Sequence, residues 1–175
     1  GIVNADQLLN ACDFRAHERA FQMLSQVAGR AGRRGSRGRV VLQTRKPDLP
    51  VVAQIVAGDY PAMYKKEMAD RRTFRYPPEV RLIMISFKHR DERTVAVCAR
   101  LFADLLCPHF GDDLFGPMKP VVSYVQLQHI RRIMLKVLPT LSPTSVRTTL
   151  WAARDSVLAH SACRNVTIYF DVDPM

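Results

Sequence analysis

Residues 74–89 read FRYPPEVRLIMISFKH, a turn with two adjacent prolines followed by a run of apolar residues. The run predicts a strand over Val80–His89, which opens the second unit of the chain. Downstream, the sequence predicts a helix, a short strand, a longer strand, a helix and a final strand, over residues 92–107, 114–116, 126–138, 143–160 and 165–172. Residues 121–124 could extend the short strand or lie in a loop. The order is βαββαβ, the split-βαβ or ferredoxin-like arrangement of α+β domains.

The segment before this unit, residues 1–45, predicts an α/β pattern. A short strand (GIVN), a helix, a basic glycine-rich turn and a second strand (RVVLQT, residues 39–44) follow one another, and the apolar second strand suits a buried position in a sheet. Asp13 is the predicted N-cap of the helix. Apolar residues recur in the helix at spacings of four, four, three and four, which predicts one buried face: Ala16, Ala20, Leu24, Val27 and Ala31.

Residues 46–73 predict a connecting helix, over about 51–70, with an interruption around residues 58–61 where Gly58 and Pro61 stand. The chain is therefore expected to divide into residues 1–45, residues 46–73 and residues 74–175.

The composition indicates a polyanionic partner. The 175 residues include 26 Lys and Arg against 16 Asp and Glu, which gives a net charge of +10 and a pI near 10.0. Such a balance is typical of proteins that bind nucleic acid. The four cysteines form no CxxC pair, so we expect neither a zinc site nor disulfides, and a reducing cytoplasm. No apolar run reaches the roughly 20 residues that a membrane span requires. Because the chain begins with Gly1 and GIV resembles the tail of a strand, we expect a piece of a longer protein.

Residues 26–33 read QVAGRAGR. On a helix, Gln26, Arg30 and Arg33 stand at i, i+4 and i+7, so their side chains form a stripe. A guanidinium has a rigid fork of donors that suits phosphate oxygens, and a glutamine could orient a water or a phosphate oxygen. The stripe therefore predicts a nucleotide-phosphate contact.

The alternative is that RAGRRGSRGR is a flexible, solvated tract that binds nucleic acid without a fixed geometry. The apolar periodicity of the preceding helix favours ordered positions for Arg30 and Arg33. Arg34, Arg37 and Arg39 lie beyond this helix and fit the loose tract better.

QVAGRAGR resembles motif VI of superfamily 2 helicases. GIVNAD followed by DFRAHERAFQMLSQVAGRAGR resembles motifs V and VI of the primosomal protein N′ family of replication-restart DNA helicases. GRVVLQT, the connecting helix, the FRYPP turn, FGPMKP and the terminal DVDP also look like the end of that family's sequences, so the resemblance covers nearly the whole chain. It implies that residues 1–45 are the remnant of a RecA-like helicase lobe, ahead of a C-terminal DNA-binding domain.

The resemblance implies an ATP-dependent helicase that moves 3′ to 5′, recognises stalled replication forks and restarts replication by primosome assembly. Arg30 and Arg33 would be the arginine fingers and Gln26 the γ-phosphate contact, which makes these three the expected catalytic residues. Asn4 and Asp6 would line the nucleotide cleft, although Asp6 could equally be a turn residue.

Cofactors and partners also follow from the resemblance. The full-length protein would use ATP and Mg²⁺ and would hold zinc, with no zinc site in this fragment. Its partners would be forks and single-stranded/duplex junctions of DNA, single-stranded DNA-binding protein and other primosome proteins, with no membrane, in the bacterial cytoplasm at the nucleoid. Because the sequence has no GxxxxGK[ST] loop and no DExH-type motif, we expect this chain to bind DNA without hydrolysing ATP.

Two sets of residues in the second unit are candidate DNA contacts. Arg75 and Tyr76, beside Phe74, could stack on unpaired bases, or the rings could simply pack. Lys119, Arg131 and Arg132, with His129, would present a basic hairpin to phosphates, or they could be ordinary surface residues. Trp151 is expected in the core of the second unit.

A second hypothesis is a non-enzymatic, basic RNA-binding or ribosome-associated module. The stripe of Gln26, Arg30 and Arg33 within an amphipathic helix is the feature that favours the helicase.

Overall fold

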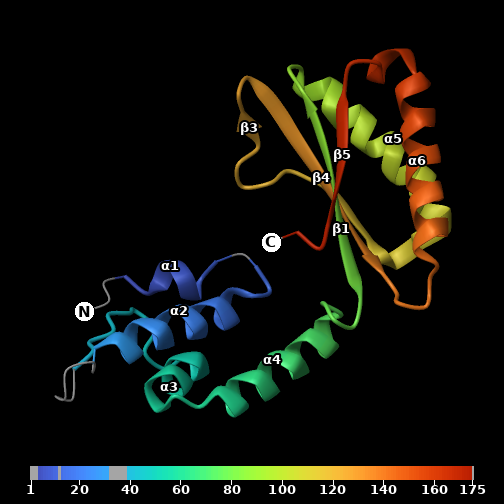
Figure 1. Cartoon of the computed structure of the whole chain (residues 1–175). Helices are drawn as coiled ribbons and strands as arrows, with labels where there is room; N and C mark the ends of the chain where they lie inside the picture. Colours follow the sequence, from blue (N-terminus) through green and yellow to red (C-terminus); the bar gives the residue numbers. More distant parts are fainter. Residues whose placement is uncertain (1–3, 12, 32–38, 175) are drawn as a thin grey trace. The chain divides into compact units, whose positions relative to one another are not determined.

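The computed structural model describes residues 4–11, 13–31 and 39–174. The chain divides into two compact units, residues 1–74 and residues 75–175, and each is described here by itself (Figure 1). Arg33 and Cys12 lie outside the described residues.

The second unit is an antiparallel sheet with two helices on one of its faces (Figure 1). Its strands are β1 (Arg81–His89), β2 (Leu114–Met118), β3 (Tyr124–Val125), β4 (Gln128–Val137) and β5 (Thr167–Val172). The strand order is β2-β4-β1-β5, and β3 forms a hairpin with β4. The helices are α5 (Glu92–Phe110) and α6 (Pro143–Ala159), each followed by a short 3₁₀ turn, η1 (Gly111–Asp113) and η2 (Ser161–Cys163). Apart from the additional two-residue strand β3, which begins at the end of the segment 121–124, this is the predicted βαββαβ order, and the predicted fold class is confirmed.

Local signals place these helices. The carboxylate of Asp91 accepts the backbone N–H of Thr94 at 2.7 Å, which caps the start of α5. Pro143 stands in the first turn of α6, where its missing N–H costs nothing.

In β2, Gly116 has φ +114°, and a Cβ there would lie 2.9 Å from the carbonyl oxygen of Arg132, so this irregular strand needs glycine.

One core fills the space between the sheet and its helices. Alternate residues of the strands face α5 and α6, and the rings of Phe87 and Phe102 meet edge to face with centroids 5.3 Å apart. Of the described helices, α5 with the turn after it is the one long and apolar enough to cross a membrane, but its apolar face lies in this core. The main core residues are Ile83, Ile85, Phe87, Val95, Phe102, Leu106, Ile133, Leu135, Val146, Leu150 and Val157.

A disulfide joins Cys98 of α5 to Cys163 of η2 inside this core, where both cysteines are fully buried. The prediction of no disulfide is therefore wrong. The two residues are 65 positions apart, and no spacing rule shows that a helix face and the turn before β5 meet. Cys107 is free and exposed.

The first unit consists of the helices α1 (Asp6–Leu9), α2 (Ala16–Arg30), α3 (Pro50–Ala57) and α4 (Tyr60–Phe74). Its core is small and is made by Ala5, Leu9, Ala20, Leu24, Val51 and Val52. The predicted interruption of the connecting helix falls at Gly58, which ends α3 with φ +67°.

The predicted strand over residues 39–44 is wrong. Within the described residues this segment has one isolated bridge residue, Leu42, and the backbone N–H of Ala5 donates to the carbonyl of Gln43 at 3.0 Å. A strand needs pairing of its N–H and C=O groups along its length, and in the described residues this segment is paired only around Leu42 and Gln43. The predicted strand GIVN falls mostly outside the described residues, since only Asn4 is described.

Candidate nucleotide and DNA contact sites

The predicted catalytic stripe begins on α2, which is anchored through its first half. Ala16, Ala20, Phe21 and Leu24 are its buried residues. The carboxylate of Glu18 accepts a hydrogen bond from the guanidinium of Arg71 on α4 at 2.6 Å. Asp13 does not occupy the N-cap position, which is Arg15, but its carboxylate accepts the N–H of Arg15 at 3.0 Å.

The second half of α2 is exposed. Val27 was predicted to be buried, yet its exposed fraction is 47%, and Ala31 is exposed as well. The last buried residue of α2 is Leu24, so the apolar periodicity of the sequence continues beyond the part of the helix that is buried. The last turns of the helix are therefore open on every side that the structure describes.

Gln26 and Arg30 lie on these open turns, four residues apart, and both are exposed. Within the described residues neither side chain makes a hydrogen bond or an ion pair, and no atom lies within 4 Å of where a Cβ on Gly29 would stand. A guanidinium with open space beside it fits an anionic ligand such as the phosphates of ATP. Arg33, the third member of the stripe, falls outside the described residues.

Asp6, a predicted nucleotide-cleft residue, holds the loop after the basic tract. Its carboxylate accepts the hydroxyl of Thr44 at 2.6 Å and the backbone N–H of Arg45 at 3.1 Å, and these bonds, the hydroxyl first, hold the pKa of Asp6 below its ordinary value. Asn4, its predicted companion, is exposed with φ +61°. Asp6 therefore ties α1 to residues 44–45, and its contact with a nucleotide stays a prediction.

Arg75 and Tyr76, predicted DNA contacts, surround a buried lysine. The guanidinium of Arg75 pairs with the carboxylate of Asp113 at 2.7 Å. The ammonium of Lys136 lies 4.5 Å from the ring centre of Tyr76 and 4.9 Å from that of Phe115. Burial, with the charge of Arg75, lowers the pKa of Lys136. These contacts fit the packing alternative for Tyr76, and base stacking stays a prediction.

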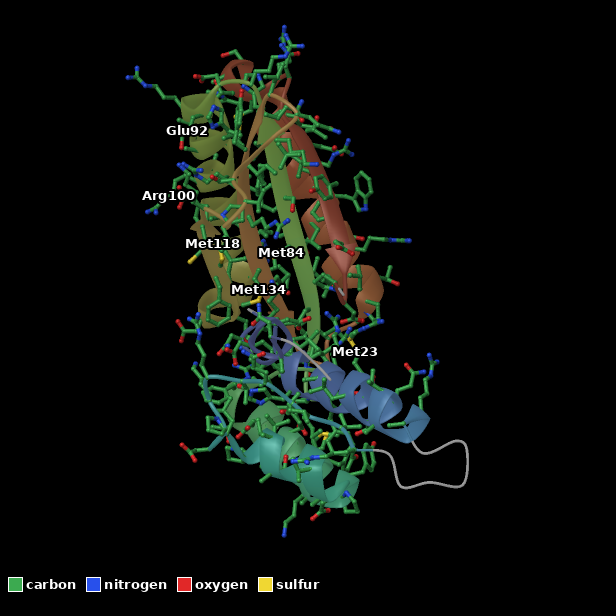
Figure 2. The ribbon with its side chains drawn as sticks, turned by 90° about the vertical axis from the view of Figure 1, so that its left-hand side faces the viewer. Met23, Met84, Glu92, Arg100, Met118 and Met134 are labelled. Atoms are coloured by element: carbon green, nitrogen blue, oxygen red, sulfur yellow. A yellow bond between two sulfur atoms is a disulfide. The ribbon has the colours of Figure 1, made fainter. Side chains whose placement is uncertain are left out.

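Glu92, at the start of α5 (Figure 2), gathers three of the basic residues predicted near the hairpin. Its carboxylate lies 2.9 Å from the guanidinium of Arg131, 3.0 Å from the ammonium of Lys119 and 3.9 Å from Nδ1 of His129. The hydrogen bond from Arg131, and then that from Lys119, hold the pKa of Glu92 below its ordinary value. Of the predicted basic set of Lys119, Arg131 and Arg132 with His129, the structure brings Lys119, His129 and Arg131 to this one carboxylate, and their contact with DNA stays a prediction.

Arg132 is separated from that set. Successive residues of a strand point to opposite faces, so Arg132 faces away from the helices that Arg131 approaches. Its Nε atom is buried without a hydrogen-bond partner in the described part of the chain.

Comparison with known proteins decides the family. The model described as "Primosomal protein N C-terminal domain" matches residues 72–175. This chain belongs to the primosomal protein N family. Proteins named replication restart protein PriA resemble it: that of Treponema pallidum is 36% identical over 177 residues, which cover 100% of this chain and 26% of the relative. That of Bacillus subtilis is 33% identical over 138 residues, 78% of this chain and 17% of the relative. That of Synechocystis sp. is 30% identical over 178 residues, 100% of this chain and 20% of the relative.

The chain thus spans about a quarter or less of the length of these PriA relatives. In the residues that the structure describes, no group of three His, Cys, Asp or Glu side chains could hold a metal ion.

A groove in the second unit of this PriA-family chain was missed by sequence reasoning. It has a volume of about 700 Å³ and lies between α6 and the edge strand β5, with Leu141, Val146, Leu150 and Phe170 in its apolar lining. Trp151, predicted in the core, is 45% exposed on its wall. The signal was present in the sequence, because the buried positions 146, 150, 153 and 157 define a helix face that excludes position 151.

Proposed function

We propose that the chain is the C-terminal part of an ATP-dependent 3′-to-5′ DNA helicase that recognises stalled replication forks and restarts replication by primosome assembly. Two observations support the proposal: membership of the primosomal protein N family, and the side chains of Gln26 and Arg30, which are exposed on an anchored helix and make no hydrogen bond or ion pair with the described residues. The setting is the bacterial cytoplasm at the nucleoid, with single-stranded DNA-binding protein and other primosome proteins as partners.

The observation that supports the proposed catalytic role is the exposed position of the Arg30 side chain on an ordered helix. Arg71 pairs with the carboxylate of Glu18 within its own unit, whereas Arg30 is exposed at the end of α2 and makes no ion pair with the described residues. When bound, ATP with Mg²⁺ supplies the phosphoryl group that is transferred. Gln26 and Arg30, with Arg33 beyond the described residues, would bind its phosphate oxygens.

DNA binding is proposed for this chain itself, without ATP hydrolysis. The net charge of +10 supplies non-specific attraction to phosphates. In the second unit, Lys119, His129 and Arg131 meet at a single carboxylate, so this set carries excess positive charge. Arg132, Arg75 and Tyr76 complete the proposed DNA-contact residues.

The test is the DNA-stimulated ATPase activity of the full-length protein with Arg30→Ala or Arg33→Ala. An arginine finger contributes about 10³-fold or more to the rate of phosphoryl transfer, so we expect a loss of that order while DNA affinity changes less than about twofold. Arg39→Ala is the matched control, because Arg39 is an exposed arginine of the loose tract. Lost DNA affinity with normal ATP turnover would contradict the proposal and favour the non-enzymatic RNA-binding or ribosome-associated module.

A further inference from the structure

The segment that connects β2 to β4, residues 121–127, reads VVSYVQL. It contains β3 and the two turn residues of the hairpin that β3 forms with β4, and we call it the apolar tip. The exposed fractions are 94% for Val121, 63% for Val122, 52% for Tyr124 and 69% for Leu127. Single exposed apolar residues are ordinary on protein surfaces. Here four of seven consecutive residues are large, apolar and more than half exposed, which is unusual for one short segment and fits a surface that another molecule covers.

The tip is held in place by the hairpin. Tyr124 pairs with His129 across β3 and β4 with ring centres 4.7 Å apart, and the N–H of Ile130 donates to the carbonyl of Ser123 at 2.8 Å. The two turn residues, Gln126 and Leu127, have φ of +51° and +61°. Such turns favour Asn-Gly, so leucine at this position is strained. Strain of this kind is retained where a side chain has a use at that place.

The surroundings of the tip are basic. Lys119 and His129 flank it in the chain, and Arg131 follows on β4. The register places Lys88 beside Ile130 and His89 beside His129, and Arg90 follows them. The nearby carboxylates are Asp91, which caps α5, and Glu92, which is shared by three basic groups. An apolar tip set among cations fits an anionic partner that also offers apolar faces, which describes DNA with unpaired bases.

We propose that this tip is a wedge that packs against the unstacked bases of a DNA junction, while Lys119, His129 and Arg131 hold the adjoining phosphates. The inference rests on the proposed function, because it names the part of the DNA that the second unit contacts. Proteins that insert apolar side chains at base steps unstack the bases and so gain contact area. A fully paired duplex offers the tip no such faces, so the wedge discriminates between junction and duplex.

The experiment uses this chain and a three-way DNA junction that carries 2-aminopurine, a base whose fluorescence rises on unstacking, at the branch point. Wild-type chain should raise the fluorescence at the branch point but not in a matched duplex, and should bind the junction at least tenfold more tightly than the duplex at the same salt concentration. The double variant Val121→Ser/Val122→Ser should lose both the fluorescence rise and the preference, and keep duplex affinity. Val56→Ser is the matched control, since Val56 is 77% exposed in the first unit.

Leu127→Gly separates the wedge from simple misfolding. Glycine suits the positive φ of residue 127, so this variant should keep or raise the melting temperature while it loses most of the junction preference. Junction binding and fluorescence that match wild type in both tip variants would overturn the wedge. Wild-type chain that binds junction and duplex equally, with no fluorescence change, would overturn it also but leave DNA binding in place. Wild-type chain that binds no DNA would remove the proposed function itself, together with the wedge.

Discussion

The two units differ in the size of their hydrophobic cores and in how their exposed basic side chains are paired. The second unit has 19 buried residues in one core cluster, against six in the core cluster of the described part of the first unit. The difference is large enough to set different tolerances to mutation. The proposed site residues differ in the same way, because Gln26 and Arg30 are exposed on α2 whereas Lys119 and Arg131 are partly neutralised by Glu92. Among the described residues, the first unit leaves the side chains of Gln26 and Arg30 without ion pairs, whereas the basic residues of the second unit share the carboxylate of Glu92.

The difference between the two cores is tested most strongly by replacing one buried phenylalanine in each unit with alanine. Phe102→Ala should cost about 3–5 kcal/mol, because the ring is fully buried against Phe87. Phe21→Ala should cost about 1–2 kcal/mol, because its ring neighbour Tyr60 is half exposed and water can reach the space. Urea unfolding of the second unit is followed by the fluorescence of Trp151, the single tryptophan, and that of the first unit, which is largely helical, by circular dichroism. Equal shifts of the unfolding midpoint for the two variants would show that the cores do not differ as described.

A pair of glycines tests backbone tolerance in the same way. Gly116→Ala should cost about 2–3 kcal/mol, because φ is +114° and the new Cβ would lie 2.9 Å from one backbone atom and 3.0 Å from another. Gly58→Ala in the first unit should cost about 1 kcal/mol, because φ is +67° but no atom lies within 4 Å. Melting temperatures of the two variants give the comparison. A larger loss for Gly58→Ala would contradict it.

Sequence alone predicted the second unit well because its signals are local. The cap at Asp91, the proline at position 143 and the apolar run of β1 each act within a few residues. The strand over residues 39–44 was mispredicted because a strand depends on neighbouring strands from distant parts of the sequence. The disulfide between Cys98 and Cys163 was missed for the same reason.

The candidate sites divide along the same line. The stripe of Gln26 and Arg30 follows from helical spacing, and α2 does present both side chains to solvent. That Glu92 neutralises Lys119 and Arg131 could not be predicted, because these residues are 27 and 39 positions from it and meet only in the folded sheet. The exposure of the hairpin tip also depends on tertiary structure, since an apolar run such as VVSYV predicts burial just as well.

Removal of the Glu92 carboxylate should increase the positive charge that the second unit offers to DNA. Glu92→Gln frees Arg131 and Lys119 for phosphates, so we expect DNA affinity at low salt to rise several-fold and the slope of log affinity against log salt to steepen by about 1–2. Asp104→Asn makes the same change of net charge on α5, where Asp104 pairs with Arg100 on an already exposed face (Figure 2). Filter binding across a salt series measures both. A slope change of the same size in the control would mean that only net charge matters.

The smallest expected effect concerns Glu67, a carboxylate whose pKa is raised, whereas that of Glu92 is lowered. Burial raises the pKa of Glu67 in the first unit above its ordinary value of 4.5, although His17 lies 3.4 Å away. Because the folded pKa lies above the unfolded one, folding is favoured by protonation, and this stabilisation is lost as the pH rises through the folded pKa. Glu67→Gln stays neutral, so its free energy of unfolding should match wild type near pH 4 and exceed it slightly at pH 7. Helix content followed by circular dichroism during urea unfolding at both pH values measures this difference. A Gln variant that is less stable than wild type at pH 7 would show that the charge pair with His17 outweighs the cost of burial.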